Sequence, residues 1–196
     1  LVMNVIHYLD QYSISAFGDD STINELKKFD GLPILKMNEL VKFAKLNDIN
    51  SAICAIGDNK IRAQKYNYLR DQGFDMVSIF HPKSLIDSKV SFGNNVIVEM
   101  GTAVHTHSEI GNNVFLGGDA LIGHHNIIGN HVLIGGNVSL GGSVIIEDFV
   151  TIGVGASIKP GVKIGEGAII GVGAAVINDI KPHTIAVGVP ARQINK

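Results

Sequence analysis

Two adjacent histidines and a glycine that follows them are the residues of this sequence best suited to chemistry. His124 and His125 lie side by side, and Gly142 follows at a fixed interval. A neutral imidazole accepts a proton near neutral pH, so it suits a general base that activates an attacking hydroxyl or amine. A backbone N–H with no side chain in the way, such as that of Gly142, suits the oxyanion formed during acyl transfer.

A six-residue period predicts how these groups are positioned. From Ile86 to Val176 every sixth residue is Ile, Leu, Val or Phe, and Gly often follows it. The residue four places later is mostly small or β-branched, with Ser108 and Asn126 as departures. Neither helix nor regular strand has this period, whereas a short strand followed by a turn does. A Gly-rich β-sandwich is the alternative, but sandwiches do not keep one phase for so long.

Three such hexads close one triangular coil of 18 residues, so the pattern predicts a parallel β-helix of about five coils. Residues 18 apart then lie one above another at about the 4.8 Å strand spacing. His107 is expected beneath His125, and Gly142 one coil above His124. His124 and His125 are expected on an outward-facing turn that a neighbouring subunit could reach.

The part of the chain before the repeat has a different composition. Of the 23 glycines, only Gly18, Gly31, Gly57 and Gly73 precede the repeat, which predicts an α/β domain over 1–82 and a β-helix domain over 83–196. Helices are predicted over 2–11, 37–46 and 59–71, and strands over 13–17, 51–56 and 76–80. This alternation predicts a small parallel, Rossmann-like sheet. Its usual first strand and Gly-rich phosphate turn are not found in the sequence.

Motifs along the whole chain resemble one enzyme family. They are FGDD at 17–20, GLP at 31–33, AIGDN at 55–59 with Arg62, His81-Pro82, the hexapeptide repeat, and VGVPAR at 187–192. In this order they resemble the sugar acetyltransferases related to sialic acid O-acetyltransferases and UDP-amino-sugar N-acetyltransferases. The resemblance implies a left-handed β-helix, acetyl-CoA as cosubstrate, a sugar-nucleotide or sugar substrate, and a homotrimer with active sites between subunits.

The resemblance also implies roles for single residues. His124 takes the position of the catalytic histidine, and His125 stands where the family usually has an acidic residue that orients it. Leu133 stands where a second histidine contacts substrate or acetyl-CoA. Gly142 aligns with the glycine whose amide meets the thioester oxygen. Further candidates are Val154 and Val172, which align with positions lining the pantetheine arm, and Asp19, Asp20, Gly57 and Asn59, which align with the part of the family that binds the sugar nucleotide.

Composition narrows the alternatives. A net charge of −2 gives no indication of the basic surface that nucleic-acid binding requires. No run of apolar residues is long enough for a membrane span. No signal peptide is visible, so we expect a cytoplasmic protein. Cys54 is the single cysteine, and its place in the first domain argues against a covalent acyl-enzyme.

We therefore expect N-acetylation of a nucleotide-linked amino sugar, with no metal. O-acetylation of a sialic-acid-like sugar and a non-catalytic trimeric scaffold stay open. A zinc-dependent hydratase is also open, because the histidines at 105, 107, 124, 125 and 131 resemble those of hexapeptide-repeat carbonic anhydrases. Those enzymes do not usually carry an α/β domain. His105 and His131 are otherwise expected to be polar surface residues.

Overall fold

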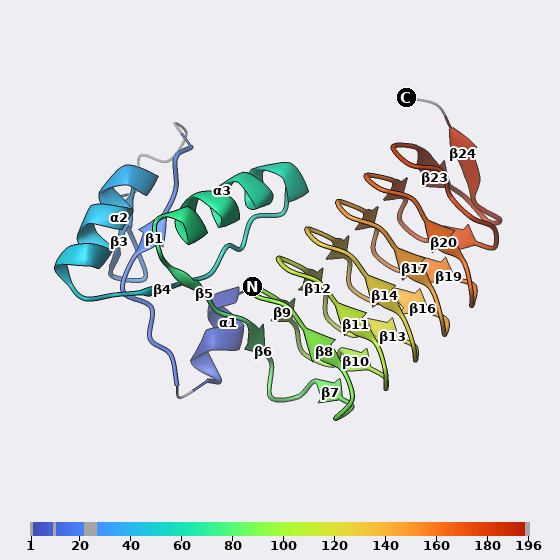
Figure 1. The fold of residues 1–196 in the computed structure, drawn as a ribbon, viewed down its shortest axis with the longest axis horizontal. Helices are drawn as coiled ribbons and strands as arrows, with labels where there is room; N and C mark the ends of the chain where they lie inside the picture. Colours follow the sequence, from blue (N-terminus) through green and yellow to red (C-terminus); the bar gives the residue numbers. More distant parts are fainter. Residues whose placement is uncertain (1, 10, 22–26, 195–196) are drawn as a thin grey trace.

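The computed structural model describes residues 2–9, 11–21 and 27–194. An α/β unit lies at one end, and a triangular stack of parallel coils extends away from it (Figure 1). None of the helices in the described ranges combines the length and hydropathy that a bilayer crossing needs.

Three sheets of stacked short strands form the faces of the stack. The first face contains β7 (Leu85–Ile86), β10 (Ala103–Val104), β13 (Leu121–Ile122), β16 (Ser139–Leu140), β19 (Ser157–Ile158) and β22 (Ala175–Val176). The second contains β8 (Ser91–Phe92), β11 (Glu109–Ile110), β14 (Ile127–Ile128), β17 (Ile145–Ile146) and β20 (Lys163–Ile164). The third contains β6 (Ile79–Phe80), β9 (Ile97–Val98), β12 (Phe115–Leu116), β15 (Leu133–Ile134), β18 (Thr151–Ile152), β21 (Ile169–Ile170), β23 (Ile185–Val187) and β24 (Arg192–Ile194).

The register confirms the predicted β-helix. Within each face, strands of successive coils pair in parallel at equivalent positions, for example Leu121 with Ser139 and Ile122 with Leu140. The last strand of the third face, β24, instead pairs antiparallel with β23. The second residue of these strands points inward, and Ile122, Ile134, Ile146 and Ile152 are among the most deeply buried side chains. One continuous apolar core therefore runs along the axis of the stack.

Three columns of short loops form the corners of the prism. The first corner joins the third face to the first (loops 99–102, 117–120, 135–138, 153–156 and 171–174). The second joins the first face to the second (105–108, 123–126, 141–144 and 159–162). The third joins the second face to the third (93–96, 111–114, 129–132, 147–150 and 165–168). The third residue of these loops has positive φ, which Gly, Asn, Asp and His tolerate best and which accounts for His107 (φ 59°) and His125 (φ 57°) there.

The α/β unit matches the prediction in its helices. It contains α1 (Val2–His7), α2 (Met37–Leu46) and α3 (Asn59–Asp71), and the last two have the predicted bounds. Asp58 caps α3 by accepting hydrogen bonds from the backbone N–H groups of Lys60 and Ile61. α1 ends earlier than predicted, and residue 10 of that prediction lies outside the described residues.

The small parallel sheet predicted for this unit is divided into two sheets, one of which also contains an antiparallel pair. The unit contains a three-stranded mixed sheet, β1 (Phe17–Gly18), β3 (Leu32–Leu35) and β2 (Lys28–Phe29), and a separate parallel pair, β4 (Ser51–Ala52) and β5 (Asp75–Met76). The strand predicted over 13–17 begins only at Phe17, and that over 51–56 ends at Ala52. The strand predicted over 76–80 divides, because Ile79–Phe80 pairs with β9 of the β-helix. The hairpin β2–β3 was missed, although Asp30-Gly31, both with positive φ, is a typical two-residue hairpin turn.

The α/β unit is fastened to the third corner by buried polar side chains of α3. Arg62, only 1% exposed, donates hydrogen bonds to the carbonyls of Asn113, His131 and Val132. Asn59 donates to the carbonyl of Val150 and to the Thr151 hydroxyl. Since Ile79–Phe80 already belongs to the third face, the division at 82/83 stays a prediction.

Candidate active site

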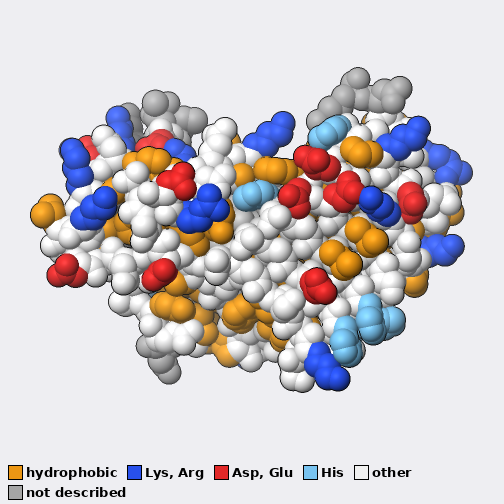
Figure 2. Space-filling model, in the orientation of Figure 1, with side chains coloured by type: hydrophobic (Ala, Val, Ile, Leu, Met, Phe, Trp, Pro, Cys, Tyr) orange, Lys and Arg blue, Asp and Glu red, His pale blue; other side chains and the backbone are white. Residues whose placement is uncertain are grey.

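The second corner brings the predicted chemical groups together. The rings of His107 and His125 stack with centroids 4.8 Å apart and an angle of 11° between their planes. A Cβ on Gly142 would lie 2.5 Å from Cε1 and 2.7 Å from Nε2 of His124, so the His124 ring lies directly against Gly142. Histidine side chains gather at one edge of the β-helix, with hydrophobic side chains nearby (Figure 2). The predicted stacking of 107 beneath 125 and 142 above 124 is therefore confirmed.

The Gly142 amide has no hydrogen-bond partner in the described part of the chain. At three other loops, a carboxylate from the coil below accepts the equivalent N–H: Asp87 from Thr106, Glu99 from Gly118, and Glu147 from Glu166. The position equivalent to those carboxylates beneath Gly142 is Gly123, which has no side chain. A Cβ at Gly123 would lie 2.7 Å from the backbone of Gly141, so a larger residue is excluded there. The close packing of two coils therefore leaves one donor unpaired beside an imidazole.

The His124 ring makes its polar contact with His125. Their Nδ1 atoms are 3.0 Å apart, and the rings are nearly perpendicular, at 86°. Both side chains are exposed on the surface of the protomer. Sequence reasoning left the orienting partner of His124 open, and this contact places an imidazole where a carboxylate would otherwise be expected.

Two buried polar residues hold the loop that carries these histidines. The Asn126 side chain accepts a hydrogen bond from Val144 N–H and donates one to the Gly123 carbonyl. The Ser108 hydroxyl donates to the same carbonyl. Ser108 and Asn126, the departures from the repeat, therefore connect the coils below, at and above His124. An imidazole that can accept a proton and an amide that can donate to an oxyanion are held beside each other.

The remaining predicted acyl-donor positions lie elsewhere on the β-helix. Val154 and Val172 are exposed on successive coils of the first corner, where Gly136 lies one coil below Val154. Leu133 lies on β15 of the third face and is half-buried. Within one protomer, neither the valines nor Leu133 lie on the corner that carries His124 and Gly142.

The predicted substrate residues lie in the α/β unit. Asp20 accepts a hydrogen bond from Met37 N–H, the first amide of α2, and forms an ion pair with Lys65. The Lys65 hydrogen bond lowers the pKa of Asp20 below its usual value. Asp20 also borders a pocket of about 400 Å³ with Lys36 and Lys65. Asp19 accepts a hydrogen bond from Ser21 N–H.

Gly57 and Asn59, the other two substrate candidates, lie near Arg62. The Gly57 carbonyl accepts a hydrogen bond from Arg62, and Asn59 accepts another through Oδ1. With its amide donated to the β-helix, Asn59 has a structural role. Substrate binding by all four residues stays a prediction.

The expectation for His131 as a surface residue is wrong. Its ring lies between Phe149 (centroids 4.7 Å apart) and Tyr66 (5.9 Å), and its Nδ1 is 2.8 Å from the Asn113 amide nitrogen. Burial lowers the pKa of His131 below its usual value. α3 covers this corner, and nothing local in the sequence indicates that. His105 is exposed, as expected.

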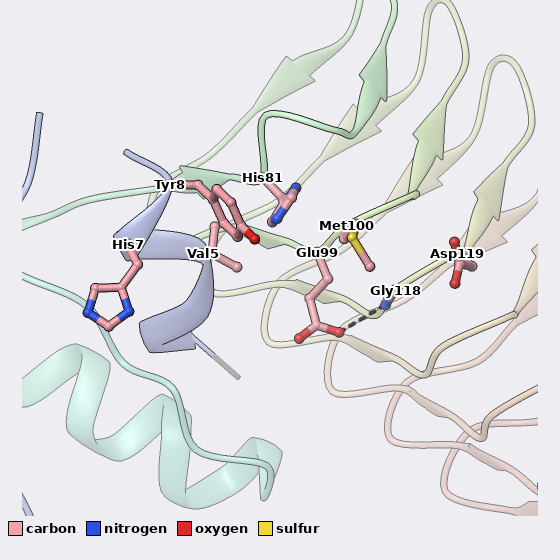
Figure 3. A pocket seen from close by; sticks show the side chains of 8 residues that line it. All are labelled: Val5, His7, Tyr8, His81, Glu99, Met100, Gly118 and Asp119. Atoms are coloured by element: carbon pink, nitrogen blue, oxygen red, sulfur yellow. Dashed lines mark hydrogen bonds between the residues drawn. The ribbon is translucent and has the colours of Figure 1, made fainter. Parts of the chain in front are cut away.

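Sequence reasoning missed a pocket of about 530 Å³ between α1 and the first corner. Figure 3 shows Tyr8 and His81 on one side of it and Met100 and Asp119 on the other, with Glu99 accepting a hydrogen bond from Gly118 N–H. Met100 and Gly118 lie one coil apart in the same loop column as Gly136, Val154 and Val172. That spacing could have indicated a continuous surface strip along the first corner. Among the described residues, no three His, Cys, Asp or Glu side chains form a group able to hold a metal ion.

Residues 1–69 match the family model described as the PglD N-terminal domain. Among the curated proteins compared by sequence, none matches this chain. Among solved structures, PerB from Caulobacter crescentus, in complex with CoA and GDP-perosamine, is 30% identical, with a TM-score of 0.83 over 86% of this chain and 82% of that one. A mutant of perosamine N-acetyltransferase from the same organism, with the same two ligands, is also 30% identical, with a TM-score of 0.82 over 85% of this chain and 79% of that one.

The acetyltransferase domain of PglB from Neisseria gonorrhoeae is 24% identical, with a TM-score of 0.90 over 98% of this chain and 93% of that one. This match bears on the fold and agrees with a β-helix behind an α/β unit, left-handed as the family resemblance implies. The matches to the PglD N-terminal domain and to PerB cover both parts of the chain. The chain therefore belongs to the hexapeptide-repeat sugar acetyltransferases of the left-handed β-helix type.

Proposed function

We propose that this protein transfers the acetyl group of acetyl-CoA to the amino group of a nucleotide-linked amino sugar. The amine attacks the thioester carbonyl carbon, His124 Nε2 takes the proton that the amine loses, and the C–S bond then breaks. The proton passes to the CoA thiolate, so that CoA leaves as a thiol. Gly142 N–H donates to the oxyanion of the tetrahedral intermediate.

The observation that carries this proposal is the unpaired Gly142 amide beside the His124 ring. In three other loops a carboxylate accepts a hydrogen bond from the equivalent backbone N–H. The Gly142 N–H has no such acceptor and lies next to a base, which is the arrangement that acyl transfer needs. PerB, which shares 30% identity, supports the substrate class through its complex with CoA and GDP-perosamine.

Direct transfer fits the chemistry of the lone cysteine. Cys54 is buried, and burial raises the pKa of its thiol to about 11. A thiol that stays protonated at neutral pH is a poor nucleophile, and Cys54 lies in the α/β unit away from the second corner. An acetyl-cysteine intermediate therefore has no support in this geometry.

The proposal includes a homotrimer with the site between subunits. His124 and Gly142 lie on the second corner, whereas Val154 and Val172 lie on the first corner of the same chain. A second copy whose first corner faces this second corner would bring the two sets together. Exposed apolar side chains surround the histidines, namely Leu121, Ile127 and Ile145, and an interface would cover them.

The decisive experiment measures thiol release from acetyl-CoA with a panel of acceptors. The panel contains GDP-perosamine, a UDP-linked amino sugar and a sialic acid. We expect release with an amino-sugar nucleotide, and a loss of kcat of about 10²–10⁴-fold in His124→Asn. His105→Asn, which changes an exposed histidine one coil below, should keep wild-type turnover.

Turnover with the sialic acid alone would replace this proposal with O-acetylation. Wild-type kcat in His124→Asn would remove the base assignment.

A further inference from the structure

On the second corner, His124 and His125 make a polar contact that has no role in the reaction proposed above. Their Nδ1 atoms are 3.0 Å apart, a hydrogen-bond distance. Two imidazole nitrogens form a hydrogen bond only if one of them carries a proton and the other does not. The contact therefore couples the tautomer of one ring to that of the other.

We infer that His125 is a positioning residue that holds His124 in the tautomer protonated at Nδ1. In that state His124 Nδ1–H donates to the bare Nδ1 of His125, and His124 Nε2 is left unprotonated beside Gly142. This inference rests on the proposed function, because it assigns the proton acceptor for the reaction to Nε2. His125 works here through a neutral ring, whereas a carboxylate in its place would work through its charge.

The structure holds the His125 ring from below. It stacks on His107 at 4.8 Å, and His107 Nδ1 is 2.9 Å from the Thr106 hydroxyl. The backbone N–H of His125 donates to the Thr106 carbonyl at 3.0 Å. A ring held in this way presents its Nδ1 to His124 in a set direction, as an orienting group must.

The charged groups around the pair leave it without a carboxylate partner among the described residues. On the coils below, Asp87 accepts a hydrogen bond from Thr106 N–H and lies 3.7 Å from His105, and Lys89 is exposed. The loop above, which carries Gly142 and Ser143, has no titratable side chain, and Lys159 lies one coil farther. The two rings therefore gain one positive charge when His124 takes the proton of the attacking amine, with no carboxylate beside them to balance it.

This charge difference sets the response to pH. A proton taken up by the pair from solution disables the base, either by occupying Nε2 of His124 or by reversing the hydrogen bond. A carboxylate at position 125 would stabilise the protonated base, so the base would be lost at a higher pH.

The first test is the pH profile of kcat/KM for wild type, His125→Asp, His125→Gly and His105→Asn. In His125→Asp, we expect the acid limb to move to higher pH by about one unit. In His125→Gly, which tolerates the positive φ and has no acceptor for Nδ1–H, we expect kcat to fall by about 10²-fold with little change in KM. His105→Asn should keep the wild-type profile. An acid limb unmoved in His125→Asp, or wild-type kcat in His125→Gly, would overturn the inference.

The second test needs no substrate, so it separates this inference from the proposed function. Nitrogen NMR of the histidine-labelled full chain reports which ring nitrogen carries the proton. We expect His124 to be protonated mainly at Nδ1 and His125 at Nε2 in the wild type, and the preference of His124 to be lost in His125→Gly. If His124 is protonated at Nε2 in the wild type, His125 does not position it, whatever sugar the enzyme acetylates.

Discussion

Gly142 shows how one missing side chain serves two purposes. It leaves room for the His124 ring, which would lie 2.5 Å from a Cβ at this position, and its N–H has no carboxylate beneath it because residue 123 is also glycine. Alanine at either position would disturb the site, at 142 by displacing the imidazole and at 123 by pushing two coils apart. The site thus depends on two glycines in adjacent coils.

Gly142→Ala should therefore impair the reaction more than the fold. The added methyl displaces the His124 ring, and a misplacement of about 1 Å can lower the rate by about 10²-fold. We expect a fall in kcat of that order, with a melting temperature close to wild type because the loop is partly exposed. Ser143→Gly, on the same loop, serves as the control. An unchanged kcat in Gly142→Ala would mean that the ring does not need this position.

At the scale of elements, α3 and the third corner form a joint built from buried polar groups. Arg62 and Asn59 satisfy loop carbonyls of successive coils, and the Asn95 amide donates to Asn113, which in turn contacts His131. Burial lowers the pKa of Arg62 to about 10, so it stays charged at neutral pH. Removal of the guanidinium would take the Arg62 donor away from the loop carbonyls of Asn113 and His131, whereas the Val132 carbonyl keeps the N–H of Phe115.

His131 makes this joint sensitive to acid. Burial lowers its pKa in the folded protein below the usual 6.5, so the unfolded chain binds a proton first as the pH falls. The free energy of unfolding should therefore fall below about pH 6.5 and level off once the folded state is also protonated. We expect His131→Asn, which tolerates the positive φ, to weaken this dependence in denaturant titrations from pH 7.5 to 5 at fixed protein concentration.

The exposed His105→Asn is the matched control and should retain the wild-type dependence. A His131→Asn curve parallel to that of the wild type would show that the acid sensitivity arises elsewhere.

For the whole molecule, the proposed trimer makes activity depend on assembly. Ile127 is 49% exposed beside the histidines and points away from the core, so a charge there leaves the coil intact in one protomer. Buried in an interface, the same charge would be strongly unfavourable. We expect Ile127→Glu to have the molar mass of a monomer in light scattering. It should keep the circular dichroism spectrum of the wild type and lose acetyl-transfer activity.

Leu46→Glu, on the exposed side of α2, is the control and should remain trimeric and active. A fully active, monomeric Ile127→Glu would exclude a site shared between subunits.

The sequence alone determined the features that repeat or are local. With a six-residue period, three hexads form one coil, and each strand pairs with the equivalent strand of the next coil. Residues 18 apart therefore stack, as His107 does under His125 and Gly142 does over His124. The bounds of α2 and α3 were predictable because helices are set by neighbouring residues, such as the Asp58 cap.

Only the tertiary structure decided how groups without such a period meet. The division of the α/β strands into two sheets, the burial of His131 under α3 and the Nδ1–Nδ1 contact of His124 and His125 depend on side-chain directions and on contacts between distant segments. These contacts follow from how whole elements pack, and several arrangements are compatible with the same local pattern. The sequence therefore predicts where each residue lies along the β-helix. Its hydrogen-bond partners and its burial are decided only when the elements pack together.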